Sequence, residues 1–305
     1  PGPGSAELMR QAWVVVNPTK VEDAAALRAQ VGPALRAAGW AVTWCETTPA
    51  DPGGGLAGAA VRAGAGLVVA CGGDGTVMAC AGALAGSGVP LALLPAGTGN
   101  LLAHNLELPV APADALEVVV HGAVRRVDVG RVEGGGCFTV MAGMGFDAAM
   151  MQGAPDGLKR RLGWPAYAVS GLRRLRDRRM RLWLTVDDDP PRRLRARTVL
   201  VGNVGTLRGG VALLPDARPD DGLLDVLVLA PRTLRDWASV ATHLLRGRRD
   251  GTAQVSRHRA RRVRIEADRP EPRQLDGDPL APGRRLDIRV DPGALLVRVP
   301  APEAR

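Results

Sequence analysis

Short apolar segments alternate with helix-forming segments over the first part of the chain, from Trp13 to about His121. The apolar segments read AWVVVN, AVTWC, GLVVAC and PLALLP. Helices are expected between and after them, at residues 21–38, 56–63 and 77–86 and from about Pro112. Strands that alternate with helices in this way form a parallel sheet with helices on both faces. We therefore predict an α/β lobe with a parallel sheet over residues 9–125.

The pattern changes after Arg125, where apolar and polar residues alternate with a period of two. Segments of this kind include RRVDVGRVE, MRLWLTVD, RARTVLVGN and RRLDIRV. This period is typical of antiparallel strands that bury one face. Two segments, residues 157–178 and 232–246, have a helical pattern instead. We predict a β-rich, sandwich-like antiparallel lobe over residues 126–293.

The charge of the chain comes almost entirely from arginine. The formal net charge is +9, and because Lys20 and Lys159 are the two lysines, 38 of the 40 basic residues are arginines. Arginine favours anionic partners, although a compositional bias towards arginine explains the same numbers. Aromatic residues make up 3% of the chain, which leaves few rings to stack on bases. We therefore expect no nucleic-acid partner.

Cysteine usage and the long uncharged segment bear on the location of the protein. The four cysteines are Cys45, Cys71, Cys80 and Cys137. They lie in apolar segments and form no CxxC pair, which is typical of reduced thiols in a cytoplasmic protein. No charged residue occurs from Gly75 to Leu106, but Pro90 and Pro95 interrupt any helix that could span a membrane there. We predict a cytoplasmic protein.

Residues 158–181, LKRRLGWPAYAVSGLRRLRDRRMR, place arginines around an apolar centre that contains Trp164 and Tyr167. Such a segment can lie on an anionic membrane surface, which would make the protein peripheral to the inner membrane face. A helix packed on the β lobe with a solvated basic face explains the same pattern. Both interpretations stay open, and so does the oligomeric state, a homodimer included.

The segment VVACGGDGT ends a buried strand with three glycines and one carboxylate, Asp74. Glycines at this place let backbone N–H groups approach a polyanion, and Asp74 could hold Mg²⁺ against the same phosphates. A simple strand-to-helix turn would look similar. However, the first strand ends in NPTK and the fourth in PAGTGN, and ligands bind at the carboxyl ends of parallel strands. The three loops together favour a phosphate site.

The common phosphate-binding and metal-binding motifs are absent from the sequence. Neither lysine follows a glycine, which excludes a Walker A loop, and the signatures of protein kinases and the GxGxxG dinucleotide motif are missing. The four histidines, at positions 104, 121, 243 and 258, form no HxxxH pair. A zinc site or a histidine-based catalytic site is therefore not expected.

Seven motifs occur in a fixed order: NPTK, GGDGT, PAGTGN, VDVG, GMGFDA, PDDGLLDV and DGD. Over nearly the whole chain they resemble the bacterial diacylglycerol kinase and lipid kinase family, which is related to sphingosine kinases and NAD kinases. The resemblance implies transfer of the γ-phosphate of ATP to a lipid hydroxyl, with Mg²⁺, in a cleft between the two lobes. It also implies that the last strand, about residues 294–300, returns to the nucleotide-binding lobe. Diacylglycerol is the expected lipid, and residues 126–293 are the expected lipid-substrate lobe.

The resemblance assigns roles to residues that match the motifs of the family. The residues that it implies for nucleotide binding are Asn17, Thr19, Lys20, Thr47, Gly73, Asp74, Gly75, Thr76 and Thr98. Thr48 matches almost as well as Thr47. The carboxylates of Asp74 and Asp128 match acidic residues around the catalytic Mg²⁺.

Two further assignments concern the second lobe. A structural Mg²⁺ site is implied at the Asp221 carboxylate and the carbonyls of Arg218 and Leu223, where a polar turn before a strand is the other interpretation. Asp278 of LDGDP matches the general base of the family. The same DGD is also typical of a type I′ hairpin turn.

The sequence departs from many relatives at Leu101, where they have an aspartate, and at Met78 and Ala79, where they have Asn-Glu. One carboxylate that helps to shape the site in those relatives is therefore missing. Two alternatives stay open: a kinase of another hydroxylated substrate, such as a sphingoid base, another lipid alcohol or NAD, and a nucleotide-binding regulatory protein without turnover.

Overall fold

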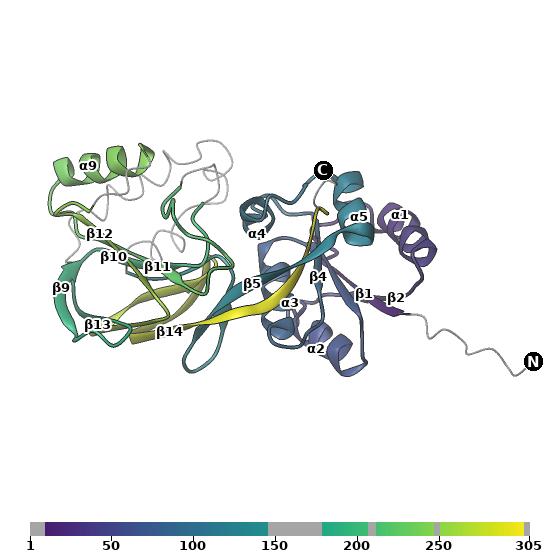
Figure 1. The fold of residues 1–305 in the computed structure, drawn as a ribbon, viewed down its shortest axis with the longest axis horizontal. Coiled ribbons are helices and arrows are strands. Elements are labelled where there is room, and N and C mark those ends of the chain that lie inside the picture. The colour runs from purple at the N-terminus through teal and green to yellow at the C-terminus, as the bar shows by residue number, and fades with distance from the viewer. Residues whose placement is uncertain (1–9, 146–178, 207–211, 247–250, 302–305) are drawn as a thin grey trace, which may run out of the picture. The chain divides into compact units, whose positions relative to one another are not determined.

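The computed structural model describes residues 10–145, 179–206, 212–246 and 251–301 of the chain. The chain divides into two compact units (Figure 1). The first contains the residues up to Val127 and those from Ala294 onward, and the second is Asp128–Gly293.

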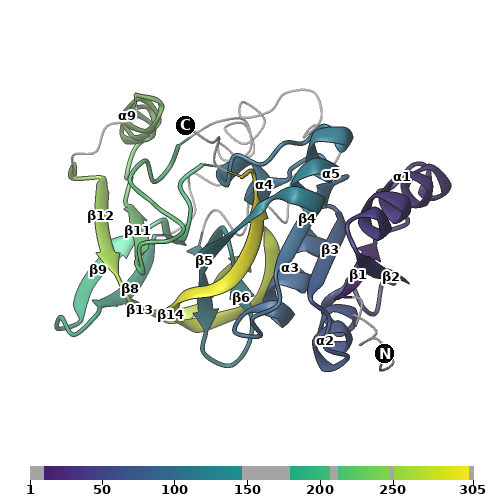
Figure 2. The ribbon, with the colours of Figure 1, turned by 45° about the vertical axis from the view of Figure 1, so that its right-hand side comes forward.

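The first unit is an α/β unit with a parallel sheet. Its elements are β1 (Arg10–Val16), α1 (Ala24–Ala37), β2 (Trp40–Glu46), α2 (Gly54–Arg62), β3 (Leu67–Gly72), α3 (Asp74–Leu84), β4 (Leu91–Pro95), α4 (Leu101–Asn105) and α5 (Pro112–His121). The strand order is β4-β3-β1-β2, and every neighbouring pair is parallel. In Figures 1 and 2, α1 and α5 lie on one side of this sheet and α2 and α3 on the other. The predicted α/β lobe is confirmed.

The apolar alternation of the strands explains these two layers. Val14 and Val16 of β1 share one buried cluster with Leu35 of α1 and Val119 of α5. Val15 points to the opposite face, where α2 and α3 pack against each other with small residues such as Ala57. A strand that is apolar on both faces needs helices on both, which is what the sequence pattern predicted.

The second unit is β-rich and mainly antiparallel. Its elements are β5 (Ala123–Val132), which begins in the first unit, β6 (Cys137–Phe138), β7 (Met141–Gly145), β8 (Met180–Val186), β9 (Arg192–Ala196), β10 (Thr198–Gly202), β11 (Leu224–Leu229), α9 (Leu234–Leu245), β12 (Val255–Ala260), β13 (Arg262–Leu275) and β14 (Asp278–Val299), which ends in the first unit. The strands run in the order β12-β11-β10-β7-β13-β14, with β8 beside β13 and β9 beside β8. One core cluster includes Phe138, Met144, Leu182 and Ile265. The predicted β-rich lobe is confirmed.

Helix starts differ from the predicted ones for reasons of capping. The helix expected from residue 21 begins at Ala24, because the Asp23 side chain accepts a hydrogen bond from the Ala26 N–H (2.8 Å). The helix expected from residue 77 begins at Asp74, with Gly73 as its N-cap. Helix α9 begins after a capping box of Thr233 and Asp236. The helix predicted at residues 157–178 lies outside the described residues.

Candidate active site

The first and third strands are linked where they end, by Asn17 and Thr76. Asn17 follows β1, and its Nδ2 donates a hydrogen bond to Oγ1 of Thr76 in α3 (3.2 Å). The Oδ1 of Asn17 accepts hydrogen bonds from the backbone N–H (3.0 Å) and the hydroxyl (2.8 Å) of Thr19. Thr76 is buried, whereas Thr19 lies at the surface. The structure therefore brings together Asn17, Thr19 and Thr76 of the predicted site.

The two glycine turns lie against each other. A Cβ on Gly97 would be only 2.6 Å from the Cα of Gly73, so this contact needs glycine at position 97. The Ala96 N–H donates a hydrogen bond to the carbonyl of Gly72 (3.0 Å), which holds the turn after β4 beside the turn after β3. Strand ends that were predicted to meet at one edge of the sheet do so.

Asp74 stands at the first position of α3, where a carboxylate interacts favourably with the helix dipole. Its Oδ1 accepts a hydrogen bond from the Leu101 N–H at the start of α4 (2.6 Å). A Cβ on Gly99 would lie 2.1 Å from Oδ2 of Asp74, so Gly99 leaves the space that this carboxylate occupies. The backbone of residue 101 thus contacts Asp74 whatever its side chain is. This role of Leu101, Gly97 and Gly99 was missed from the sequence.

The remaining predicted nucleotide residues have different environments. Lys20, Gly75 and Thr98 are exposed, and each belongs to a loop or helix start at this edge of the sheet. Thr47 is buried, and its N–H donates a hydrogen bond to the carbonyl of Val16 (2.8 Å). The roles of these four residues stay predictions.

This edge of the sheet has the chemistry of an anion site. The backbone N–H groups in the first turn of α3 have no partner within the helix and carry partial positive charge. Gly73 and Gly75 keep that turn free of side chains, and Gly73 has an extended backbone (φ −92°, ψ −172°). A phosphate can therefore approach the backbone closely at this end of α3.

The two carboxylates predicted around the catalytic Mg²⁺ differ in whether an oxygen is left to bind a cation. One oxygen of Asp74 bonds to Leu101, and this half-buried side chain keeps a second oxygen for a cation. Mg²⁺ is commonly held by one or two carboxylates together with substrate phosphates and water, so Asp74 fits such a site. Asp128, in the second unit, is buried, and its two oxygens accept hydrogen bonds from the Gly222 N–H (2.6 Å) and the Gly293 N–H (2.7 Å). Asp128 thus has a structural role in this arrangement, and a role in metal binding stays a prediction.

The carboxylate of the second predicted metal site, Asp221, pairs with an arginine side chain. The Oδ2 of Asp221 forms an ion pair with Arg259, and its Oδ1 accepts a hydrogen bond from the Leu223 N–H (3.1 Å). Asp225 lies near the same guanidinium (3.7 Å), and burial raises the pKa of Asp225 to about 6. The described part of the chain contains no group of three or more His, Cys, Asp or Glu side chains that could hold a metal. A cation at Arg218, Asp221 and Leu223 stays a prediction, and it would have to compete with Arg259.

The DGD segment forms a two-residue hairpin turn between β13 and β14. Leu275 pairs with Asp278, and Asp276 and Gly277 between them have positive φ values of 46° and 93°, as a type I′ turn requires. The hairpin interpretation of this motif is therefore correct. Asp278 is the exposed first residue of β14, and its role as general base stays a prediction.

Asp276, which the sequence analysis did not assign, holds a loop in place. Its carboxylate accepts hydrogen bonds from the N–H groups of Thr139 (2.8 Å), Val140 (2.9 Å) and Met141 (2.7 Å). The Thr139 hydroxyl is a fourth donor, at 3.1 Å. Burial raises the pKa of Asp276 to about 6, although these hydrogen bonds act in the opposite direction. No local sequence signal could have revealed a contact between residues so far apart in the chain.

Comparison with known proteins gives the same assignment over both units. Residues 11–132 match the model of the diacylglycerol kinase catalytic domain, and residues 139–299 match that of the YegS C-terminal NAD kinase beta sandwich-like domain. A probable lipid kinase YegS-like protein of Pseudomonas aeruginosa is 37% identical over 244 residues, which cover 79% of each chain. One from Xanthomonas euvesicatoria is 32% identical over 94% of this chain and 96% of its own.

Solved structures share the fold. A putative diacylglycerol kinase from Bacillus anthracis superposes with a TM-score of 0.79 at 22% identity, covering 98% of both chains. An NAD kinase from Archaeoglobus fulgidus in complex with ATP has a TM-score of 0.55 at 14% identity, covering 95% of this chain and 93% of its own. Among the described residues, no helix is both long enough and apolar enough to cross a bilayer. The matches to both family models and to these relatives show that the chain belongs to the bacterial diacylglycerol kinase and lipid kinase family and is a lipid kinase of the YegS-like group.

Proposed function

We propose that this lipid kinase transfers the γ-phosphate of ATP to the hydroxyl of diacylglycerol in a Mg²⁺-dependent reaction that yields phosphatidic acid. The observation that carries the proposal is the close approach of the glycine turns at Gly73 and Gly97, with the Asp74 carboxylate beside them. This arrangement suits a triphosphate because backbone N–H groups can surround its oxygens while one carboxylate faces them.

The loops of the first unit bind and orient the nucleotide. Asn17 and Thr19 form one wall, since their side chains are already linked to each other and to Thr76. Lys20 and Thr98 are exposed at the same edge and can reach phosphate oxygens. Mg²⁺, when bound, would neutralise negative charge on the transferred phosphoryl group. Asp74 is the residue that would hold it.

The proton of the lipid hydroxyl goes to Asp278. As the hydroxyl oxygen forms its bond to the γ-phosphorus, the bond from that phosphorus to the β,γ-bridging oxygen breaks, and ADP leaves with that electron pair. The base needs only to accept the proton, because positioning and charge neutralisation supply most of the catalysis in phosphoryl transfer. Asp278 is exposed at the start of β14, where a substrate hydroxyl can approach it.

The experiment is incubation of the full chain with labelled ATP, Mg²⁺ and, in separate reactions, diacylglycerol, a sphingoid base, another lipid alcohol or NAD, followed by separation of the products. Asp74→Asn and Asp278→Asn should each lower the rate of label transfer at least about a hundred-fold, as expected for loss of an electrostatic group or a general base. Asp114→Asn is the control for the first variant, because Asp114 also lies in the first turn of a helix but in α5. Exposed Asp268→Asn is the control for the second.

Other results would identify the other functions. Label in a sphingoid base, another lipid alcohol or NAD, with none in phosphatidic acid, would assign a different acceptor. ATP binding with no label in any acceptor would favour a regulatory protein without turnover. Parent-level transfer by either Asp variant would refute the role proposed for that residue. Cell fractionation tests the expected place of action, a cytoplasmic enzyme peripheral to the inner membrane face.

A further inference from the structure

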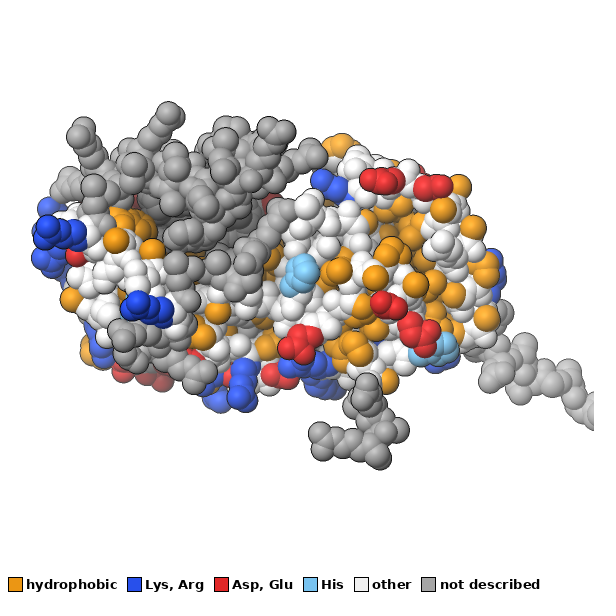
Figure 3. Space-filling model, turned by 90° about the horizontal axis from the view of Figure 1, so that it is seen from above, with side chains coloured by type: hydrophobic (Ala, Val, Ile, Leu, Met, Phe, Trp, Pro, Cys, Tyr) orange, Lys and Arg blue, Asp and Glu red, His pale blue; other side chains and the backbone are white. Residues whose placement is uncertain are grey.

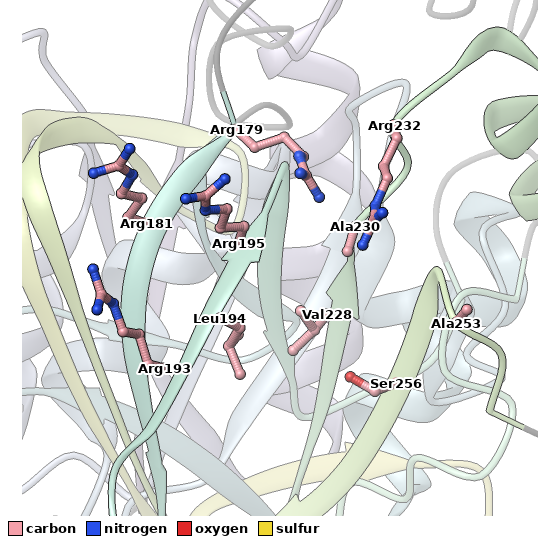
Figure 4. Close-up of a pocket in the computed structure, with 10 residues that line it drawn as sticks. All are labelled: Arg179, Arg181, Arg193, Leu194, Arg195, Val228, Ala230, Arg232, Ala253 and Ser256. Carbon is pink, nitrogen blue, oxygen red and sulfur yellow. The ribbon is translucent and has the colours of Figure 1, made fainter.

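A hollow of about 660 Å³ lies in the second unit, apart from the glycine turns and built only from second-unit residues (Figure 4). Five of its lining residues are arginines: Arg179, Arg181, Arg193, Arg195 and Arg232. Figure 3 shows Lys and Arg side chains gathered at the end of the second unit where Figure 1 places β9. None of the lining residues is an aspartate or a glutamate, within the part of the chain that the structure describes.

Three of these arginines, Arg181, Arg193 and Arg195, share one face of the β8–β9 hairpin, and Arg179 comes directly before β8. In the register of the pair, Arg181 lies directly opposite Arg195, and Trp183 lies opposite Arg193. Residues two apart on a strand point to the same face, so Arg193 and Arg195 neighbour each other there. Like charges directly opposite across two strands destabilise a sheet. The protein therefore maintains an unfavourable arrangement that a bound anion would relieve.

Two acidic side chains next to the lining residues are already engaged. Asp236 accepts hydrogen bonds from the N–H groups of Arg232 (2.7 Å) and Thr233 (3.0 Å) in the cap of α9. Asp189 pairs with Arg192, whose guanidinium is not part of the lining. The hollow is therefore lined by five arginines and by no carboxylate among the residues that the structure describes.

The opposite wall is apolar and carries one hydroxyl. Val228 and Ala230 belong to β11 and to the residue after it, and Ser256 lies on β12. Leu194, which lies on the opposite face of β9 from Arg193 and Arg195 and packs against the core, completes the apolar part. In Figure 4, Arg179, Arg195 and Arg232 gather at one end of the hollow, and Leu194 and Val228 lie below them.

The chemistry of this lining selects among anions. Each guanidinium presents a planar fork of donors that matches two oxygens of a phosphate, and several forks around one site suit a group with three or four oxygens better than a carboxylate. The apolar wall leaves room for an organic part attached to the phosphate. The described lining has no aromatic ring on which a nucleic-acid base could stack.

We propose that this arginine hollow binds the phosphate group of a phosphorylated organic molecule. Two sources share that chemistry, a phospholipid head group and a soluble phosphate ester. The site is separate from the glycine turns that we assign to ATP, so its existence does not depend on the proposed reaction.

The test uses the full chain and the double variant Arg181→Gln/Arg195→Gln, which removes the opposed pair. Arg261→Gln/Arg284→Gln is the matched control, because it removes two exposed arginines of the same unit that do not line the hollow. The probes are inorganic phosphate, against chloride at equal ionic strength, and vesicles of phosphatidylcholine with and without phosphatidylglycerol. Binding of phosphate is measured as a shift in the Tm of thermal unfolding. Binding to the vesicles is measured by co-sedimentation.

We expect phosphate to raise the Tm of the parent and of the control but not of the double variant. Without phosphate, the double variant should unfold at the same temperature as the parent or higher, since a like-charge contact is lost. If the site takes a lipid head group, binding of the double variant to the anionic vesicles falls at least about ten-fold, as loss of two charged hydrogen bonds implies. If vesicle binding is unchanged while the phosphate response is lost, the ligand is a soluble phosphate ester.

Two results would overturn the proposal. One is a double variant with the phosphate and vesicle responses of the parent. The other is an equal loss in the Arg261/Arg284 control, which would mean that net charge alone acts. Arg232→Gln, on the segment after β11, repeats the test with a single change if the double variant does not fold. Lipid phosphorylation by the same variants, with a soluble short-chain diacylglycerol, should stay at the parent rate, which separates this site from the one that binds ATP.

Discussion

Replacing Asp276 by alanine should destabilise the second unit by about 4 kcal/mol. Its carboxylate accepts hydrogen bonds from the backbone N–H groups of Thr139 (2.8 Å), Val140 (2.9 Å) and Met141 (2.7 Å). All three of these residues are buried. Each buried donor left without a partner costs about 1 kcal/mol or more, so three cost about 3 kcal/mol. Alanine at a φ of 46° adds about 1 kcal/mol, because this left-handed backbone is unfavourable for it.

Asp276→Asn separates these contributions. Asparagine tolerates the left-handed backbone, and its one oxygen can keep the hydrogen bonds of Val140 and Met141. Its NH₂ group would face the Thr139 N–H, so a loss of about 1–2 kcal/mol is expected. The free energy of unfolding from denaturant titration measures both variants, with exposed Asp268→Ala as control. If the alanine and asparagine variants both stay within about 0.5 kcal/mol of the parent, the carboxylate does not anchor this loop.

Three further changes test other parts of the structure. The pKa of Asp225 is raised to about 6, so the folded protein binds the proton of this carboxyl group more tightly than the unfolded chain does. Proton binding by Asp225 therefore stabilises the fold at low pH, and this contribution is lost as the pH rises through 6. Denaturation at several pH values should therefore show parent stability falling relative to Asp225→Asn by up to about 3 kcal/mol between about pH 4 and pH 7, and parallel curves would contradict this. Gly97→Ala places a Cβ 2.6 Å from the Cα of Gly73, and titration with ATP should show weaker binding than in the parent; unchanged affinity would mean that the two turns can separate without consequence. Thr233→Ala removes the side-chain acceptor at the start of α9 and should cost about 1 kcal/mol in thermal unfolding, whereas no change in Tm would show that this cap does not limit stability.

The sequence predicted what depends on local pattern. The double-sided apolar strands near Val14 and Val69 predicted a parallel sheet with helices on both faces. Strand ends in such a sheet share one edge, so Asn17 and Thr76 could be expected to meet before their hydrogen bond was seen. Residues 157–178, for which a helix was predicted, are not among those described.

Contacts between distant segments could not be predicted in this way. The DGD motif gave no sign of which strand its first aspartate would bind, because Thr139 is 137 residues away. The ion pair of Asp221 with Arg259 depends on the antiparallel pairing of β11 with β12, which no short segment reveals. The opposition of Arg181 and Arg195 likewise follows from strand register and not from the spacing of the arginines.

The long strand β14 has a consequence for biosynthesis. It begins beside β13, and near its end Val297 pairs with Leu91 of β4, while the Ala294 carbonyl accepts a hydrogen bond from the Gly86 N–H (2.7 Å). Leu295 and Val297 are fully buried there. During translation, the first unit therefore lacks this strand until the residues around Val297, which follow the whole second unit in the chain, have left the ribosome. Until then the edge of β4 is unpaired, and a chaperone or another nascent chain can reach it.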